Sequence, residues 1–148
     1  MSARLAGALL LSLVAGCGSG RAAGTAEYFP VESTRPLPFS AAVRVDDMLY
    51  LSGQLGTDSS TRLVPGGIGP ETRQALENIR GVLARAGATM DDVVKCTAML
   101  ADMSEWAEMN AEYVKHFSAR LPARSAFGAS GLALGARVEI ECIAHVGT

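Results

Sequence analysis

Arg124 is the residue of this 148-residue chain whose type and surroundings most directly suggest chemistry. It stands in the segment Leu-Pro-Ala-Arg-Ser-Ala-Phe, and no Asp or Glu occurs within seven positions on either side. A guanidinium is costly to bury without a partner, and its planar fork of donors pairs well with a carboxylate. Arg124 therefore either extends to water or binds an anion that the neighbouring sequence does not supply.

The strand expected at residues 136–146 carries the next candidate groups, because its side chains alternate between two faces. One set is apolar and suits a layer of helices: Val138, Ile140, Cys142 and Ala144. The other set is mixed: Glu139, Glu141, Ile143 and His145. The mixed face is either solvated or, because it includes an isoleucine, a surface that associates with another subunit.

Cysteine and histidine give little sign of a metal site. His116 and His145 lie far apart in sequence and no Cys-x-x-Cys motif occurs, so the sequence predicts no metal ligands. Cys96 and Cys142 both fall in expected strands, and we interpret them as small core residues. A disulfide between them is the alternative for an exported protein.

The elements that must position Arg124 follow the order ββ, α, β, α, ββ. Expected strands cover residues 43–45, 48–55, 90–102, 123–130 and 136–146, with a turn at Asp46-Asp47 between the first two. Expected helices begin at Pro70 and Met103. This order predicts an α+β fold with both helices packed on one face of a sheet.

Each expected helix has one apolar face. In the first helix this face comprises Leu76, Ile79, Leu83 and Ala86. In the second helix, for which Ser104 is the predicted N-cap, it comprises Trp106, Met109, Tyr113, Val114 and Phe117. We interpret both stripes as core and not as cofactor-binding surfaces.

The net charge of −2 argues against one class of function. Thirteen basic residues are scattered along the chain, and none of them form a run that could follow a phosphate backbone. The length and the 49% apolar content are those of one globular domain with a substantial core.

The N-terminal segment has the pattern of a bacterial lipoprotein signal. Residues 5–16 are apolar or small and form a segment too short to span a bilayer. Its last four residues and Cys17 give the sequence Leu-Val-Ala-Gly-Cys. We expect a signal peptide at residues 1–16, lipidation of Cys17, a flexible tether at 17–27 and a folded domain at 28–148. The predicted location is the cell envelope, with the protein held on the periplasmic face of a bacterial membrane by its N-terminal lipid.

Several blocks of the domain resemble the RidA/YjgF family of reactive intermediate deaminases. They are Leu-Tyr-Leu-Ser-Gly-Gln-Leu-Gly at residues 49–56, the long segment 71–117, Pro-Ala-Arg-Ser-Ala-Phe at 122–127 and Val-Glu-Ile-Glu-Cys-Ile-Ala at 138–144. The resemblance implies a chorismate-mutase-like α+β fold. It also implies a homotrimer whose sheets line a central β-barrel, with a ligand cleft at each subunit interface.

The resemblance further implies hydrolysis of 2-imino acids or their enamine tautomers, such as 2-iminobutanoate and 2-iminopropanoate, to 2-keto acids and ammonia without a cofactor. Arg124 matches the arginine that binds the substrate carboxylate, and Glu139 matches the glutamate that activates water. Ser52 and Gly53 match the strand segment that lines the cleft. Asn110 matches an asparagine near the cleft, although a helix-surface role is equally compatible with its position.

Two positions depart from the family pattern. Phe39 stands where many members have a tyrosine, so it lacks the hydroxyl but can still form an apolar wall. Ala126 stands where many members have a cysteine, and hydrolysis by water needs no thiol nucleophile. Both departures bear on substrate preference more than on the type of reaction.

Other functions compatible with the same scaffold are a non-catalytic carboxylate-binding or sensing protein, a ribonuclease and a structural trimer. The charge balance argues against the ribonuclease, and no nucleic-acid partner is expected. Loss of activity in an Arg124→Ala variant distinguishes the enzyme from the binding protein and the scaffold.

Overall fold

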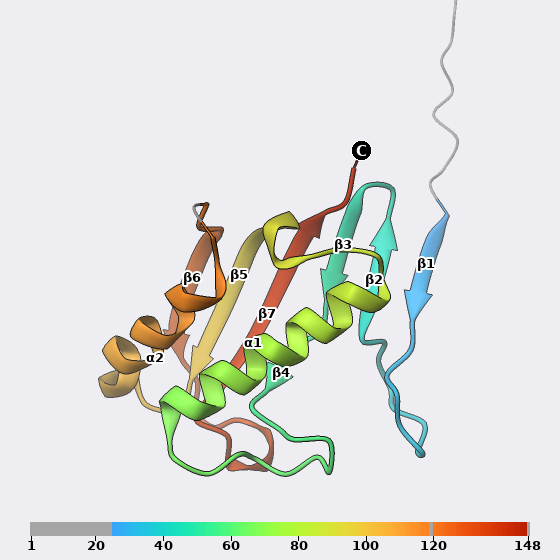
Figure 1. Cartoon of the computed structure of the whole chain (residues 1–148). Helices are drawn as coiled ribbons and strands as arrows, with labels where there is room; N and C mark the ends of the chain where they lie inside the picture. The colour runs from blue at the N-terminus through green and yellow to red at the C-terminus, as the bar shows by residue number, and fades with distance from the viewer. Residues whose placement is uncertain (1–24, 119, 148) are drawn as a thin grey trace, which may run out of the picture.

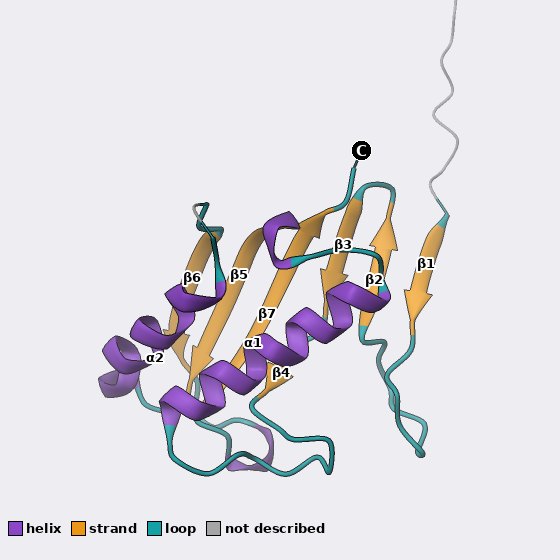
Figure 2. Ribbon diagram, viewed as in Figure 1, coloured by secondary structure: helices purple, strands orange, loops and turns teal. Residues whose placement is uncertain are grey.

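The computed structural model describes residues 25–118 and 120–147. These residues form a seven-stranded sheet with two helices packed on one face (Figures 1 and 2). The strands are β1 (Ala26–Phe29), β2 (Ala42–Val45), β3 (Met48–Leu51), β4 (Gln54–Leu55), β5 (Val93–Leu100), β6 (Ala123–Gly128) and β7 (Val138–His145). The helices are α1 (Ile68–Arg85) and α2 (Trp106–Tyr113). This arrangement confirms the predicted α+β fold.

The sheet order is β1-β2-β3-β7-β5-β6, and β4 also pairs with β7. Only β5 and β6 are parallel, and β6 is an edge strand. Four short 3₁₀ turns connect the larger elements: η1 (Met90–Asp92), η2 (Met103–Glu105), η3 (Val114–His116) and η4 (Ala133–Gly135).

The prediction of one continuous strand over residues 48–55 is wrong. The structure divides this segment into β3 and β4, which are separated by Ser52 and Gly53. Both parts pair with β7, β3 with its C-terminal half and β4 with Glu139 and Ile140. The interruption frees Ser52 and Gly53 from regular strand geometry and places them beside the start of β7.

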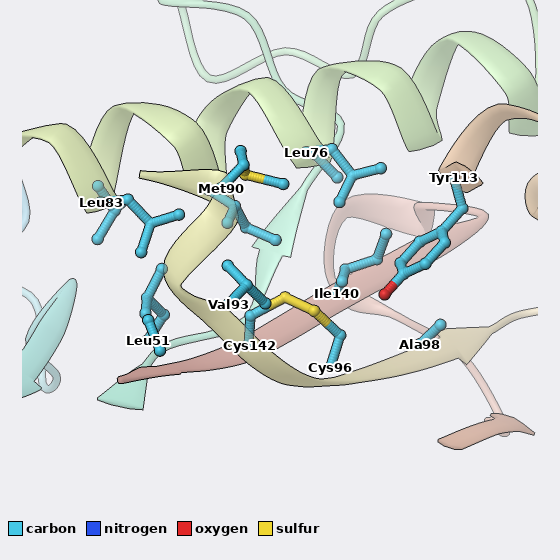
Figure 3. Packing of buried hydrophobic residues seen from close by; sticks show 14 of the residues in the cluster. Leu51, Leu76, Leu83, Met90, Val93, Cys96, Ala98, Tyr113, Ile140 and Cys142 are labelled. Atoms are coloured by element: carbon cyan, nitrogen blue, oxygen red, sulfur yellow. A yellow bond between two sulfur atoms is a disulfide. The ribbon is translucent and has the colours of Figure 1, made fainter. Parts of the chain in front are cut away.

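The core lies between the sheet and α1, as the alternation in the last strand predicts. The side chains of Val138, Ile140, Cys142 and Ala144 are fully buried under the helices, whereas those of Glu139, Glu141, Ile143 and His145 are not. The α1 face formed by Leu76, Ile79, Leu83 and Ala86 is also buried, as expected. Figure 3 shows α1 lying over this cluster.

The interpretation of Cys96 and Cys142 as free core residues is wrong in one respect. Both are buried, but they occupy paired positions on β5 and β7 and are joined by a disulfide (Figure 3). The two cysteines are 46 positions apart in sequence. Closing a loop of that length stabilises the fold by about 4 kcal/mol in the chain-entropy model.

The second helix is shorter than expected and starts differently. Ser104 is not its N-cap: it lies in η2, which Asp102 caps by accepting a hydrogen bond of 2.8 Å from the backbone N–H of Ser104, and the N-cap position of α2 itself is Glu105. The apolar stripe is also only partly core. Met109, Tyr113 and Phe117 are buried, but Trp106 and Val114 are exposed.

An ionic cluster around the buried Glu112 holds α2 and the following turn against α1. Glu112 is buried and receives Arg73 of α1 at 2.8 Å and Lys115 at 2.7 Å. Hydrogen bonds from these two cations lower the pKa of Glu112 to about 2. His116 adds a second link to α1, since its Nδ1 lies 3.3 Å from a carboxylate oxygen of Glu77. The cluster thus fixes the position of α2 relative to the sheet.

The predicted signal peptide, its lipidated Cys17 and most of the tether lie outside the described residues. The sheet begins at Ala26, so the last two residues of the predicted tether belong to β1. In the described part of the chain, neither helix has the length and apolar character needed to cross a membrane.

Candidate functional site

Arg124 lies on the edge strand β6 and points to the side of the sheet that carries the helices. Its register partner is Cys96, whose side chain lies under the helix layer. The guanidinium stacks on two rings of α2, with its Cζ 4.6 Å from the ring centre of Tyr113 and 5.8 Å from that of Trp106. Arg124 is half-buried and takes part in none of the ion pairs formed by described residues.

Tyr113 gives this arginine a rigid platform. Its side chain is only 3% exposed, and Figure 3 shows its hydroxyl end directed toward the sheet. Burial raises the pKa of the Tyr113 hydroxyl to about 12, against a smaller opposite effect from the positive charge of Arg124. The ring therefore stays neutral, and cation–π stacking holds the arginine without neutralising it.

Asn110 belongs to the same part of the molecule. It follows Trp106 by four positions and precedes Tyr113 by three, so all three residues share one face of α2. Ala126 follows Arg124 by two positions on β6 and also points to the helix side. We refer to Asn110, Arg124 and Ala126 as the Arg124 group.

Glu139 lies on β7 beside the interruption between β3 and β4. Its carboxylate covers Gly53 so closely that a Cβ on that glycine would overlap a carboxylate oxygen. Glu139 is half-buried, and it also takes part in none of the ion pairs formed by described residues. The absence of a side chain at residue 53 therefore gives the carboxylate its position.

Ser52 connects this carboxylate to the segment that carries Phe39. The Ser52 hydroxyl donates a hydrogen bond of 2.6 Å to the carbonyl of Ser40, and the Ser52 N–H donates one of 3.0 Å to the carbonyl of Ala41. Phe39 is thereby held next to the strand interruption with its ring exposed. We refer to Phe39, Ser52, Gly53 and Glu139 as the Glu139 group.

The structure thus collects the predicted site residues into two groups, whose charged members, Arg124 and Glu139, lie on opposite faces of the sheet. Glu139 pairs with Met99, whereas Arg124 is in register with Cys96, and residues 96 and 99 of β5 point to opposite sides. Arg124 and Glu139 of one chain therefore do not face a common space.

The helix-free face of the sheet, where Glu139 lies, carries large apolar side chains among its polar ones. The large apolar side chains that strand alternation places on it include Tyr50, Met99, Phe127 and Ile143. Tyr50 and Phe127 are each about half exposed. An uncovered apolar surface of this kind favours contact with another protein surface.

A cleft of about 640 Å³ adjoins the Glu139 group, and both Phe39 and Gly53 line it. It runs beside α1, where Gly81 forms part of its wall. Sequence reasoning missed this cleft, and it also missed the role of Trp106 and Tyr113 as the platform for Arg124. The aromatic spacing on α2 was visible in the sequence, but it did not show which ring would lie under the arginine.

Replacing Gly53 by alanine is expected to move the Glu139 carboxylate without unfolding the domain. The added methyl group meets only the end of a flexible side chain, which can rotate away. If Glu139 is catalytic, turnover falls by about tenfold or more while the melting temperature changes little. Steady-state kinetics and thermal unfolding measured on the same preparation check this; unchanged turnover contradicts it.

Within residues 25–118 and 120–147, no three His, Cys, Asp or Glu side chains gather in a way that could hold a metal ion.

Comparison with known proteins places the chain among relatives of similar length. Residues 32–146 match the protein family described as Endoribonuclease L-PSP. The 2-iminobutanoate/2-iminopropanoate deaminase of Mus musculus is 48% identical over 111 residues, which are 74% of this chain and 82% of the mouse protein.

Solved structures agree with this likeness. The yeast protein YEO7_yeast superposes with a TM-score of 0.78 at 34% identity, covering 83% of this chain and all of the yeast chain. YyfA of Yersinia pestis, a protein of unknown function of the conserved Rid protein family, gives a TM-score of 0.76 at 35% identity. That match covers 82% of this chain and all of YyfA.

Proposed function

The chain belongs to the Endoribonuclease L-PSP family, which includes the RidA/YjgF proteins, and from this premise we propose that it hydrolyses reactive 2-imino acids. Water adds to the imine carbon, the C–N bond breaks, and the products are a 2-keto acid and ammonia. The observation that carries the proposal is that Arg124 and Glu139 are both half-buried and form no ion pair with any other described residue, so that one can bind the substrate carboxylate and the other can activate water.

Arg124 binds the substrate carboxylate. Its guanidinium is held by the rings of Tyr113 and Trp106 and has no carboxylate partner among the described residues. Stacking restrains the plane of the guanidinium and leaves its N–H groups free to form two parallel hydrogen bonds. Fixing the carboxylate in this way also orients the imine carbon next to it.

Glu139 accepts the proton of the attacking water. An iminium carbon is already electrophilic, so the water needs an orientation and one proton acceptor. The nitrogen leaves as ammonia after it has gained the protons released from water. Phe39 and Ala126 supply neither a hydroxyl nor a thiol, so no covalent intermediate is formed with the protein at these positions.

We infer that the complete site forms between copies of the chain in a homotrimer. Arg124 and Glu139 lie on opposite faces of one sheet, so a cleft containing both side chains requires Arg124 of one subunit and Glu139 of another. The apolar helix-free face, with Tyr50 and Phe127, supports this assembly because its burial between subunits is favourable.

A trapping assay tests the proposed reaction. An amino-acid oxidase generates 2-iminobutanoate, and semicarbazide captures the imine that survives as an absorbing semicarbazone. We expect the purified full-length protein to suppress semicarbazone formation in proportion to its concentration. Unchanged trapping with short and long imino acids would contradict the proposal. In that case, 2-keto acid binding that depends on Arg124 would support a carboxylate-binding protein.

The family description mentions an endoribonuclease, but the chain does not favour that activity. Its net charge is −2, and its basic residues are scattered. Binding to a phosphate backbone needs a concentrated positive surface and weakens steeply with salt. Strong, salt-sensitive RNA binding by the purified protein would contradict our preference for the deaminase.

We further propose that the protein is exported and anchored by a lipid on Cys17. The Cys96–Cys142 disulfide supports export, because disulfides persist in oxidising compartments and are rare in the cytosol. Metabolic labelling with a radioactive fatty acid is expected to mark the wild-type protein but not a Cys17→Ser variant. Absence of label from the wild type would contradict lipidation.

A further inference from the structure

The cleft beside α1 is large for the small imino acids named above. It lies between α1, the segment 53–61 and the segment 31–41, and its volume is about 640 Å³. Binding cavities for small molecules are of this order. We call it the α1 cleft. Its apolar lining comprises Val31, Leu37, Phe39, Ala41, Leu55, Val82 and Leu134.

Every charged side chain that lines the α1 cleft already has a partner. Glu32 and Arg85 are 3.3 Å apart, and Asp58 lies 3.5 Å from Arg62. Glu77 lies 3.2 Å from Arg80 and 3.3 Å from His116. The cleft therefore offers no unpaired cation to a carboxylate, and the charged end of a substrate is held elsewhere.

The amide side chains in the wall are occupied as well. Asn78 donates hydrogen bonds of 2.9 and 3.0 Å to the carbonyls of Leu55 and Thr57, and Gln74 donates one of 2.9 Å to Asn78. Gln54 donates to the carbonyl of Ser52. These bonds hold the segment after β4 against α1 and leave mainly apolar surface to contact a ligand.

The α1 cleft adjoins the Glu139 group, because Phe39 and Gly53 line the cleft while Glu139 itself does not. Leu134 lines it from η4 with a side chain that is 67% exposed and a backbone φ of 59°. A leucine in the left-handed region is unfavourable, and such conformations concentrate at sites of function. This strained residue presents an apolar side chain to the cleft.

We propose that the α1 cleft binds the side chain of the imino acid, and that the preferred substrates carry branched or aromatic apolar side chains. This inference rests on the proposed deaminase function. The carboxylate lies at Arg124 of one subunit, and the reacting carbon lies near Glu139 of the next. The substrate side chain extends past Phe39 into the cleft, where a methyl or ethyl group would leave most of the space unfilled.

Gly81 offers a direct test. It lines the cleft from α1, and a Cβ placed on it meets no atom within 4 Å. A Gly81→Leu substitution therefore has room for its Cβ, places an apolar side chain at the wall of the cleft and raises the helix propensity of α1. Ala84→Leu is the matched control, because it adds a leucine to an exposed position of the same helix that does not line the cleft.

The experiment compares imines derived from leucine, phenylalanine and alanine, with the full-length wild type and both variants. The wild type is expected to have a higher kcat/KM for the two larger imines than for 2-iminopropanoate. Gly81→Leu is expected to lower the ratio of kcat/KM for the two larger imines to kcat/KM for 2-iminopropanoate by about tenfold or more. Ala84→Leu is expected to leave that ratio unchanged. An equal effect on all three substrates, or a wild-type preference for the smallest, overturns the proposal.

Calorimetric titration with 4-methyl-2-oxopentanoate and pyruvate separates this proposal from the proposed reaction. These keto acids are stable products, so their binding needs no turnover. Tighter binding of the larger keto acid that is lost in Gly81→Leu supports the side-chain site even if no imine is hydrolysed. Equal affinity for both keto acids, or no binding of either, overturns it.

Discussion

Arg124→Ala is expected to lower kcat/KM for 2-iminobutanoate by at least about 100-fold, mainly through a higher KM. The substrate carboxylate would lose its only proposed cationic partner, and removing one member of a desolvated charge pair is costly. Because Arg124 makes no ion pair among the described residues, its loss leaves no buried acid without a partner and the domain should remain folded. Kinetics in the trapping assay, together with circular dichroism, check both expectations.

Two further substitutions show whether the geometry of Arg124 matters. Arg124→Lys keeps the charge but loses the planar fork and part of the ring stacking, so intermediate activity is expected. Arg80→Ala removes an exposed arginine whose partner is Glu77 and should change kcat/KM little. If Arg124→Ala and Arg80→Ala had the same small effect, Arg124 would not be the carboxylate-binding residue.

Glu139→Gln is expected to lower kcat by about 10²–10⁴-fold with a smaller change in KM. Glutamine fills nearly the same volume but cannot accept the proton of the attacking water, which is the contribution typical of a general base. Glu141→Gln is the matched control, since Glu141 points to the same helix-free face of the same strand. Equal losses in the two variants would indicate a general effect of charge on this face and not a catalytic role.

The parts of the fold that follow from local periodicity could be predicted from the sequence. The alternation in β7 identified its buried side, and the apolar spacing in α1 identified its core face. The interruption at Ser52 and Gly53 could not be predicted, because the sequence of a mainly apolar strand does not indicate which residues lack regular pairing with the neighbouring strand. The Cys96–Cys142 bond depends on the register of two strands far apart in sequence.

The candidate site, like the fold, could be predicted from the sequence only in part. Arg124, an arginine without nearby acids in a segment of small and apolar residues, pointed to an anion, and resemblance to a family pointed to Glu139. Neither signal shows that the two residues lie on opposite faces, because that relation depends on how β5 aligns with β6 and with β7. The roles of Trp106 and Tyr113 likewise depend on where α2 crosses the edge strand, which the Glu112 cluster helps to set.

The central claim is that a working site takes Arg124 from one subunit and Glu139 from another. Co-expression of Arg124→Ala and Glu139→Gln chains with different affinity tags, followed by isolation of mixed assemblies, tests it most directly. Each variant alone should be nearly inactive. Mixed assemblies should regain about a third of wild-type activity, because a cyclic trimer that contains both kinds of chain places an intact arginine beside an intact glutamate at one of its three interfaces. Mixed assemblies no more active than either variant alone would contradict the shared site.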